Sequence, residues 1–134
     1  MTPTSPHPFH GLDRVGPLAV IVQDVTRATA FYRDVLGMRF LFAAPPGLAF
    51  FDCGGVRLML SRPEGPEGAA AGSAIIYYTV DDIHAAYATL VARGAPGESP
   101  PHVVAPLGAR DLWMAFVRDS EGNLVGVMSE VIRD

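Results

Sequence analysis

The sequence predicts an α+β fold in which two similar modules each run in the order strand, helix, strand, strand, strand. Residues 20–32 and 78–90 repeat each other without a gap, with Asp24 matched to Asp82 at an offset of 58 positions. Each repeated segment is followed by three strand-like stretches separated by turn residues. One helix cannot cover both faces of a four-stranded sheet. We therefore expect the two modules to form a curved, eight-stranded mixed sheet around a cavity, with the helices on the outer face.

Length and composition limit the classes of protein to which the chain can belong. It has 134 residues, of which 49% are hydrophobic and 18% are charged, a balance that argues for one compact domain and against disorder. Its apolar stretches, such as residues 18–22, are far shorter than the roughly 20 residues that cross a bilayer. Ten basic and fourteen acidic residues are scattered singly. We expect neither a membrane nor nucleic acid as a partner.

The cysteine content and the start of the chain suggest where the protein works. Cys53 is the only cysteine, so neither an internal disulfide nor a cysteine cluster for zinc can form. A reducing, cytoplasmic location fits this composition best. The first residues are rich in proline and lack the basic and apolar regions of a signal peptide. We interpret residues 1–14 as a flexible tail.

The first module is predicted over residues 15–60. Its first strand ends at Asp24, whose carboxylate can cap the helix that follows. That helix carries an apolar stripe on one side and ends at Gly37. Further strands are expected at residues 38–42, 48–51 and 56–60.

The second module is predicted over residues 73–134. Asp82 caps its helix, which ends at Gly94. Residues 61–72 combine proline, glycine and alanine, a composition typical of a linker between the modules. Strands are expected at residues 102–105, 112–117 and 124–128.

Three motifs occur in order along the chain: the segment from Asp24 to Gly37, Val80-Asp-Asp-Ile83, and Phe116-Val-Arg-Asp-Ser-Glu-Gly-Asn123. Together they resemble the vicinal-oxygen-chelate superfamily, which includes glyoxalase I, extradiol dioxygenases and bleomycin-resistance proteins. The resemblance covers nearly everything from Val15 to Met128. It implies paired βαβββ modules, in agreement with the repeat.

In the enzymes of that superfamily, the resemblance implies a divalent metal held by His, Gln or Glu at four inward-facing positions. These positions map onto Pro17, Met59, Ile75 and Gly126 in this chain. Proline, isoleucine and glycine offer no side-chain donor, and methionine offers only a soft thioether. We therefore expect no metal at the usual site, no cofactor, and binding of a ligand rather than its conversion.

Strand alternation places residues of the same parity as these four positions on the inner face, which is mostly apolar and suits a small organic ligand. Arg57 is the candidate anchor for one anionic group, unless it lies in water at the mouth of the cavity. Met59 and Tyr77 are candidate walls. Trp113 could add a stacking wall, although core packing is the commoner use of such a residue. His102 could serve as an acid or base, or be structural.

Three functions remain open from the sequence. The missing metal ligands favour a small-molecule binding protein, similar in logic to the bleomycin-resistance proteins. A divergent metal-dependent lyase, isomerase or dioxygenase would need non-standard ligands, such as His102 with Glu98 or Glu130. An inactive dimeric scaffold is the third. In every case we expect a homodimer, because a second copy can cover the sheet edges and apolar strand faces of two small modules.

Overall fold

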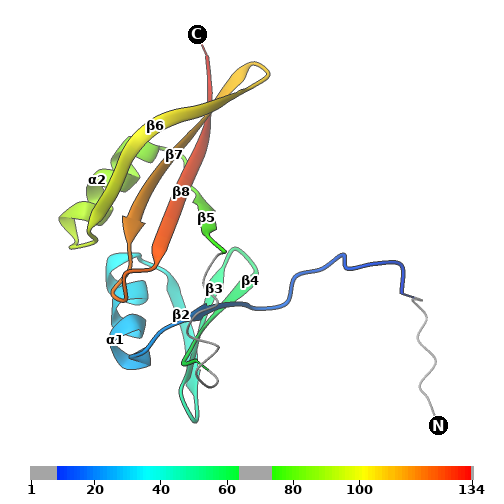
Figure 1. Ribbon diagram of the computed structural model, residues 1–134, viewed down its shortest axis with the longest axis vertical. Helices are drawn as coiled ribbons and strands as arrows, with labels where there is room; N and C mark the ends of the chain where they lie inside the picture. Colours follow the sequence, from blue (N-terminus) through cyan, green and yellow to red (C-terminus); the bar gives the residue numbers. More distant parts are fainter. Residues whose placement is uncertain (1–8, 64–73, 134) are drawn as a thin grey trace.

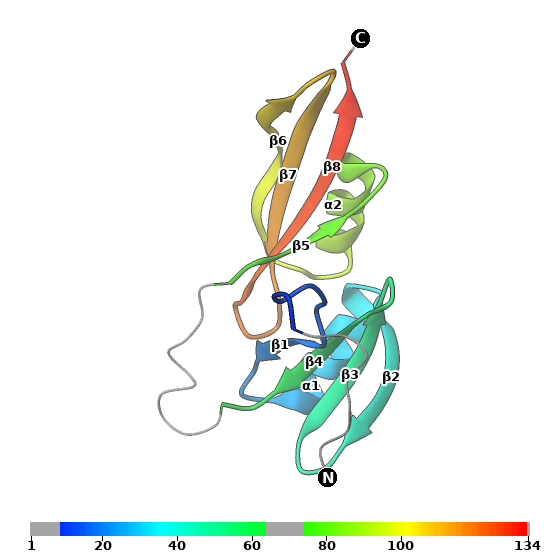
Figure 2. The ribbon, with the colours of Figure 1, turned by 90° about the vertical axis from the view of Figure 1, so that its right-hand side faces the viewer.

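The computed structural model describes residues 9–63 and 74–133, so much of the expected tail and of the expected linker at 61–72 lies outside the described residues. Two modules lie end to end along the long axis of the molecule (Figures 1 and 2). Each contains a four-stranded sheet with a helix packed on one side. No helix in the described part of the chain is long and apolar enough to cross a membrane.

The first module contains the predicted helix cap. Oδ1 of Asp24 accepts a hydrogen bond from the backbone N–H of Arg27 at 2.9 Å. The helix then widens into one π-helical turn, η1, in which the N–H of Leu36 donates to the carbonyl of Phe31. The sequence pattern does not indicate this turn. The elements are β1 (Leu18–Ile21), α1 (Val25–Ala30), η1 (Phe31–Val35), β2 (Arg39–Ala44), β3 (Leu48–Cys53) and β4 (Val56–Ser61).

The second module repeats the plan, with Oδ1 of Asp82 accepting from the N–H of Ala85 at 3.1 Å. Its elements are β5 (Ile76–Thr79), α2 (Ile83–Ala92), β6 (Gly97–Leu107), β7 (Arg110–Arg118) and β8 (Leu124–Ile132). β6 is much longer than expected and runs through Pro100, Pro101 and Pro106. It is an edge strand whose pairing shifts register three times, and such a strand tolerates prolines because its outer N–H groups need no partner.

Both sheets have the same mixed topology. The strand orders are β1-β4-β3-β2 and β5-β8-β7-β6, and only the β1–β4 and β5–β8 pairs are parallel. This confirms the α+β fold of two βαβββ modules. The eight strands are divided between two sheets of four, because no strand of one module is hydrogen-bonded to a strand of the other among the described residues.

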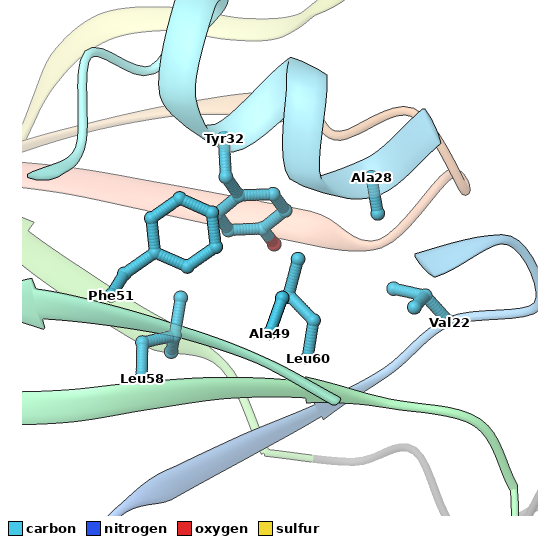
Figure 3. Close-up of a cluster of buried hydrophobic side chains, with 7 residues drawn as sticks. All are labelled: Val22, Ala28, Tyr32, Ala49, Phe51, Leu58 and Leu60. Carbon is cyan, nitrogen blue, oxygen red and sulfur yellow. The ribbon is translucent and has the colours of Figure 1, made fainter. Parts of the chain in front are cut away.

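Each helix covers one face of its own sheet. In the first module, α1 and η1 pack on β3 and β4 through a buried cluster of Val22, Ala28, Tyr32, Ala49, Phe51, Leu58 and Leu60 (Figure 3). In the second, Ile83 of α2 packs on Ala115 and Val127. Because neighbouring residues of a strand point to opposite faces, the other residues of these strands lie on the side away from the helix.

The turn between β7 and β8 joins the modules through Asp119, which is 3% exposed. Its carboxylate accepts hydrogen bonds from the backbone N–H groups of Glu121 and Asn123, both at 2.8 Å, and from Nδ2 of Asn123 at 3.0 Å. It also accepts one from the Tyr32 hydroxyl of the first module at 2.8 Å. Burial, followed by the nearby Asp119 charge, raises the pKa of Tyr32, so the hydroxyl keeps the proton that it donates.

Glu121 in the same turn caps the start of the first helix. Its side chain is 8% exposed. It accepts hydrogen bonds from the N–H groups of Gln23 and Asp24, at 2.8 and 3.2 Å, and from the Arg27 guanidinium at 2.7 Å. Burial alone would raise the pKa of Glu121, but these donors outweigh it, and the pKa lies below its usual value. The ionised carboxylate therefore stabilises the junction between the modules.

We expect Glu121→Gln to lower the free energy of unfolding by about 1–2 kcal/mol near neutral pH, because charge-assisted hydrogen bonds are lost. The pKa of Glu121 is lower in the folded chain than in the unfolded one. Its stabilising effect is therefore present above the unfolded pKa and is lost as pH falls through the folded pKa. Urea unfolding near pH 7 and near pH 3 should show the difference between wild type and variant shrinking in acid.

Asp81→Asn is the matched control for this measurement, because Asp81 is exposed and has no hydrogen bond or ion pair among the described residues. It should change the free energy of unfolding little at either pH. A Glu121→Gln effect that is the same at both pH values would contradict the assigned role.

Candidate functional site

The first module leaves one face of its sheet uncovered, which we call the first open face. Phe51 and Leu58 point to α1, so their neighbours on β3 and β4 point the other way. The pairing places Met59 between Ala19 of β1 and Phe50 of β3. The first open face contains Ala19, Ile21, Phe42, Phe50, Arg57 and Met59, and near the β3–β4 turn it also contains Arg39 and Asp52.

Two aromatic rings and a guanidinium lie together on the first open face. The rings of Phe42 and Phe50 stack with their centroids 4.8 Å apart and an angle of 29° between their planes. The guanidinium carbon of Arg57 lies 5.6 Å from the centroid of the Phe42 ring, a cation–π distance. Arg57 is exposed and forms no side-chain ion pair in the described part of the chain. Asp52 is its cross-strand neighbour, but no ion pair joins the two, so the guanidinium can still donate to an anion.

The second module also leaves a face uncovered, the second open face. Tyr77 of β5 and Phe116 of β7 lie on either side of Gly126 in the register of the sheet. Their rings meet edge to face, with centroids 5.8 Å apart. The face contains Tyr77, Thr79, His102, Leu112, Met114, Phe116, Gly126, Met128 and, at its outer end, Glu130. It is mainly aromatic and thioether surface.

The four positions that would hold the superfamily's metal do not fit one. Pro17 and Ile75 lie directly before β1 and β5, and Met59 and Gly126 lie on β4 and β8. A Cβ atom at Gly126 would lie 2.6 Å from Cδ1 of Tyr77, so the tyrosine ring covers the place where a ligating side chain would begin. Among residues 9–63 and 74–133, no group of three His, Cys, Asp or Glu side chains could hold a metal ion.

His102 lies on the second open face, because it pairs with Met114 across β6 and β7. Its Nδ1 is 2.8 Å from the carbonyl oxygen of Pro100, which orients the ring beside its own strand. Glu98 forms an ion pair with Arg118 at 3.0 Å. Glu130 lies on the same face but on β8, with β7 between it and β6, and it pairs with Leu112 rather than with Met114, the neighbour of His102. The structure therefore does not bring His102 together with either acidic residue considered as a co-ligand.

Trp113 lies on the opposite side of the second sheet from Tyr77. Its ring meets His84 of α2 edge to face, with centroids 5.1 Å apart, and packs against the cluster that contains Ile83. Core packing is thus its role in this fold, and it does not line the open face. Ala115 and Val117 of β7 are buried, and Trp113 points to the same side of the strand as they do. Alternation along β7 could therefore have placed Trp113 in the core.

Phe42 and Phe50 are site residues that the sequence pattern did not single out. Phe50 follows the simple alternation of β3. Phe42 does not, because the pairing of β2 with β3 shifts register between Phe40 and Phe42. The shift turns Phe40 toward Phe51 on the helix side and leaves Phe42 on the first open face.

Two hollows lie where the modules meet. One, of about 680 Å³, lies between the edges of β1 and β5 and the turn that contains Glu121. The other, of about 610 Å³, lies between the β3–β4 turn and α2. The open faces of one chain do not face each other, because the modules lie end to end (Figure 2). A cavity between open faces therefore needs a second chain.

Comparison with known proteins identifies the family. The profile of the Glyoxalase/Bleomycin resistance protein/Dioxygenase superfamily matches residues 14–127. No curated protein matches the chain. Among solved structures, lactoylglutathione lyase from Agrobacterium tumefaciens is 26% identical with a TM-score of 0.71, over 89% of this chain and 95% of that one.

Two further structures share the fold at lower identity. TioX from Micromonospora sp. ML1 is 24% identical with a TM-score of 0.69, over 89% of this chain and 100% of that one. A member of the superfamily from Sphaerobacter thermophilus DSM 20745 is 24% identical with a TM-score of 0.72, over 89% of this chain and 98% of that one. The family profile spans nearly the whole chain, so the chain belongs to the Glyoxalase/Bleomycin resistance protein/Dioxygenase superfamily.

Proposed function

We propose that two copies of this chain enclose cavities that bind a small, mostly apolar organic ligand without a metal ion. One observation carries the proposal: the Tyr77 ring covers Gly126, a position at which the resemblance implies a metal ligand in the enzymes. The stacked pair of Phe42 and Phe50 with Arg57 lies on the other open face. These groups suit a planar aromatic ligand that carries one anionic group.

The exposure of both open faces supports a second copy as their cover. Ile21, Phe42, Ile75 and Tyr77 each keep between 37% and 43% of their surface exposed. Exposed apolar side chains of this size favour association. A two-fold axis would set the first open face of each chain against the second open face of the other, so each contact occurs twice. Each cavity would then hold Arg57 and Met59 of one chain opposite Tyr77 and His102 of the other.

A metal-dependent lyase is the second candidate, and the similarity to the lactoylglutathione lyase favours it. It requires metal ligands outside the four usual positions. His102 is the histidine that an open face offers among the described residues, and no acidic side chain contacts it there. An inactive dimeric scaffold, the third possibility from the sequence, would bind neither metal nor ligand.

Light scattering at micromolar concentration should give a mass about twice the 14.3 kDa of one chain. Phe42→Asp should shift the protein toward the monomer, because it places a charge within the apolar contact. Thr26→Asp, on the exposed side of α1, is the control and should leave the dimer intact. A wild-type mass near that of one chain would contradict the pairing.

Arg57→Met should weaken binding of 2-naphthoate about tenfold, or on the order of 1.5 kcal/mol, because a charged hydrogen-bond donor is lost while the apolar stem is kept. Titration calorimetry measures the affinity. Arg33→Met, an exposed arginine on η1, should not change it. An unchanged affinity in Arg57→Met would show that the anion is anchored elsewhere.

Zinc, nickel, iron and manganese should not bind tightly, because the four positions supply no hard side-chain ligand. The test uses the full chain with His7→Gln and His10→Gln, which removes tail histidines able to hold metal loosely. After dialysis, elemental analysis should give far less than one ion per chain, and the protein should lack glyoxalase activity. One ion per chain that is lost in His102→Ala would instead support the lyase.

A further inference from the structure

The hollow of about 610 Å³ lies beside α2, where the two modules meet. It runs between the β3–β4 turn of the first module and α2 of the second, and we call it the junction groove. Its volume is within the range of small-molecule sites. Apolar side chains from both modules form much of its lining: Leu36, Met38, Val80, Leu90, Val125 and Val127.

Two arginines belong to the lining of the junction groove. Arg39 and Arg93 are exposed, and neither forms a side-chain ion pair in the part of the chain that the structure describes. Arg93 donates one hydrogen bond, to the carbonyl of Val35 at 3.3 Å. Asp52 is the acidic residue of the lining. The groove therefore carries two positive charges against one negative charge above an apolar surface.

The remaining titratable groups of the groove do not change this balance. Burial raises the pKa of the Cys53 thiol, and the neighbouring Asp52 adds to the effect. Burial, followed by the nearby Cys53, raises the pKa of Tyr78. Both groups are therefore neutral near pH 7. An anion in the groove would meet a net positive charge.

We propose that the junction groove binds a small apolar molecule with a single carboxylate, its hydrocarbon part on the apolar lining and its carboxylate near Arg39 and Arg93. Apolar burial supplies the affinity, and the two guanidinium groups select an anion over a neutral analogue. This site is formed by one chain and uses none of Phe42, Phe50, Arg57, Met59, Tyr77 and His102, although Arg39 and Asp52 are in register with Arg57 on the first sheet. It is therefore independent of the function proposed above.

Cys53 makes the groove directly measurable, because it is the only thiol of the chain and it lines the groove. The rate of its alkylation by N-ethylmaleimide can be followed by intact-mass spectrometry. Octanoate should slow the reaction at concentrations at which octanamide, the neutral analogue, does not. Arg39→Gln and Arg93→Gln should each raise the octanoate concentration needed for protection about three- to fivefold, the range for exposed charge pairs.

Two further variants distinguish binding in the junction groove from binding on the first open face or a general effect of surface charge. Arg33→Gln is the matched surface control and should leave protection unchanged. Arg57→Met should also leave it unchanged, whereas loss of protection there would place octanoate on the first open face and overturn the proposal. It would equally be overturned by no protection from octanoate, by equal protection from octanamide, or by full protection in both Arg39→Gln and Arg93→Gln. Binding of 2-naphthoate by Arg57→Met tests the function proposed above, and none of these outcomes depends on it.

Discussion

One buried carboxylate, that of Asp119, sets how the two halves of this molecule sit against each other. Two backbone N–H groups of its own turn and the hydroxyl of Tyr32, 87 positions earlier in the chain, share its oxygens. A change in the conformation of this turn would therefore also disturb its hydrogen bond to the first helix. The same turn delivers Glu121 to the start of α1, where the helix dipole and three donors favour a negative charge. The modules are thereby held end to end, as Figure 1 shows.

This placement has a consequence for function. Each helix already covers one face of its sheet, and the end-to-end arrangement prevents either module from covering the open face of the other. The resemblance implies that the enzymes of this superfamily hold their metal on this uncovered surface. Here the same surface carries Phe42, Phe50, Arg57 and Tyr77 in place of metal ligands. A fold supports several chemistries, and the side chains on the site decide among them. The proposal that an aromatic anion binds between two chains rests on those side chains.

Local sequence signals predicted most of the fold but only part of the site. Asp24 and Asp82 cap helices because a cap depends on neighbours three residues away, which the sequence displays directly. The hydrogen bonds that Asp119 and Glu121 accept from the first module come from residues 87 and 98 positions away, so no local pattern reveals them. Alternation placed Arg57, Met59 and Tyr77 on open faces. It could not place Phe42, since a register shift in β2 reverses the parity, and the parity of β7 assigns Trp113 to the core.

That each ligand site is built from two chains is tested most directly by mixing two defective variants. Arg57→Met impairs the first open face, and Tyr77→Glu places a negative charge on the second, so neither homodimer should bind 2-naphthoate well. In a mixed dimer, one cavity combines both defects and the other combines both intact faces. Random pairing should therefore restore roughly a quarter of the wild-type binding sites, measured by titration calorimetry after subunits have been exchanged. No recovery on mixing would contradict the account, because a site built within one chain would carry a defect in every chain.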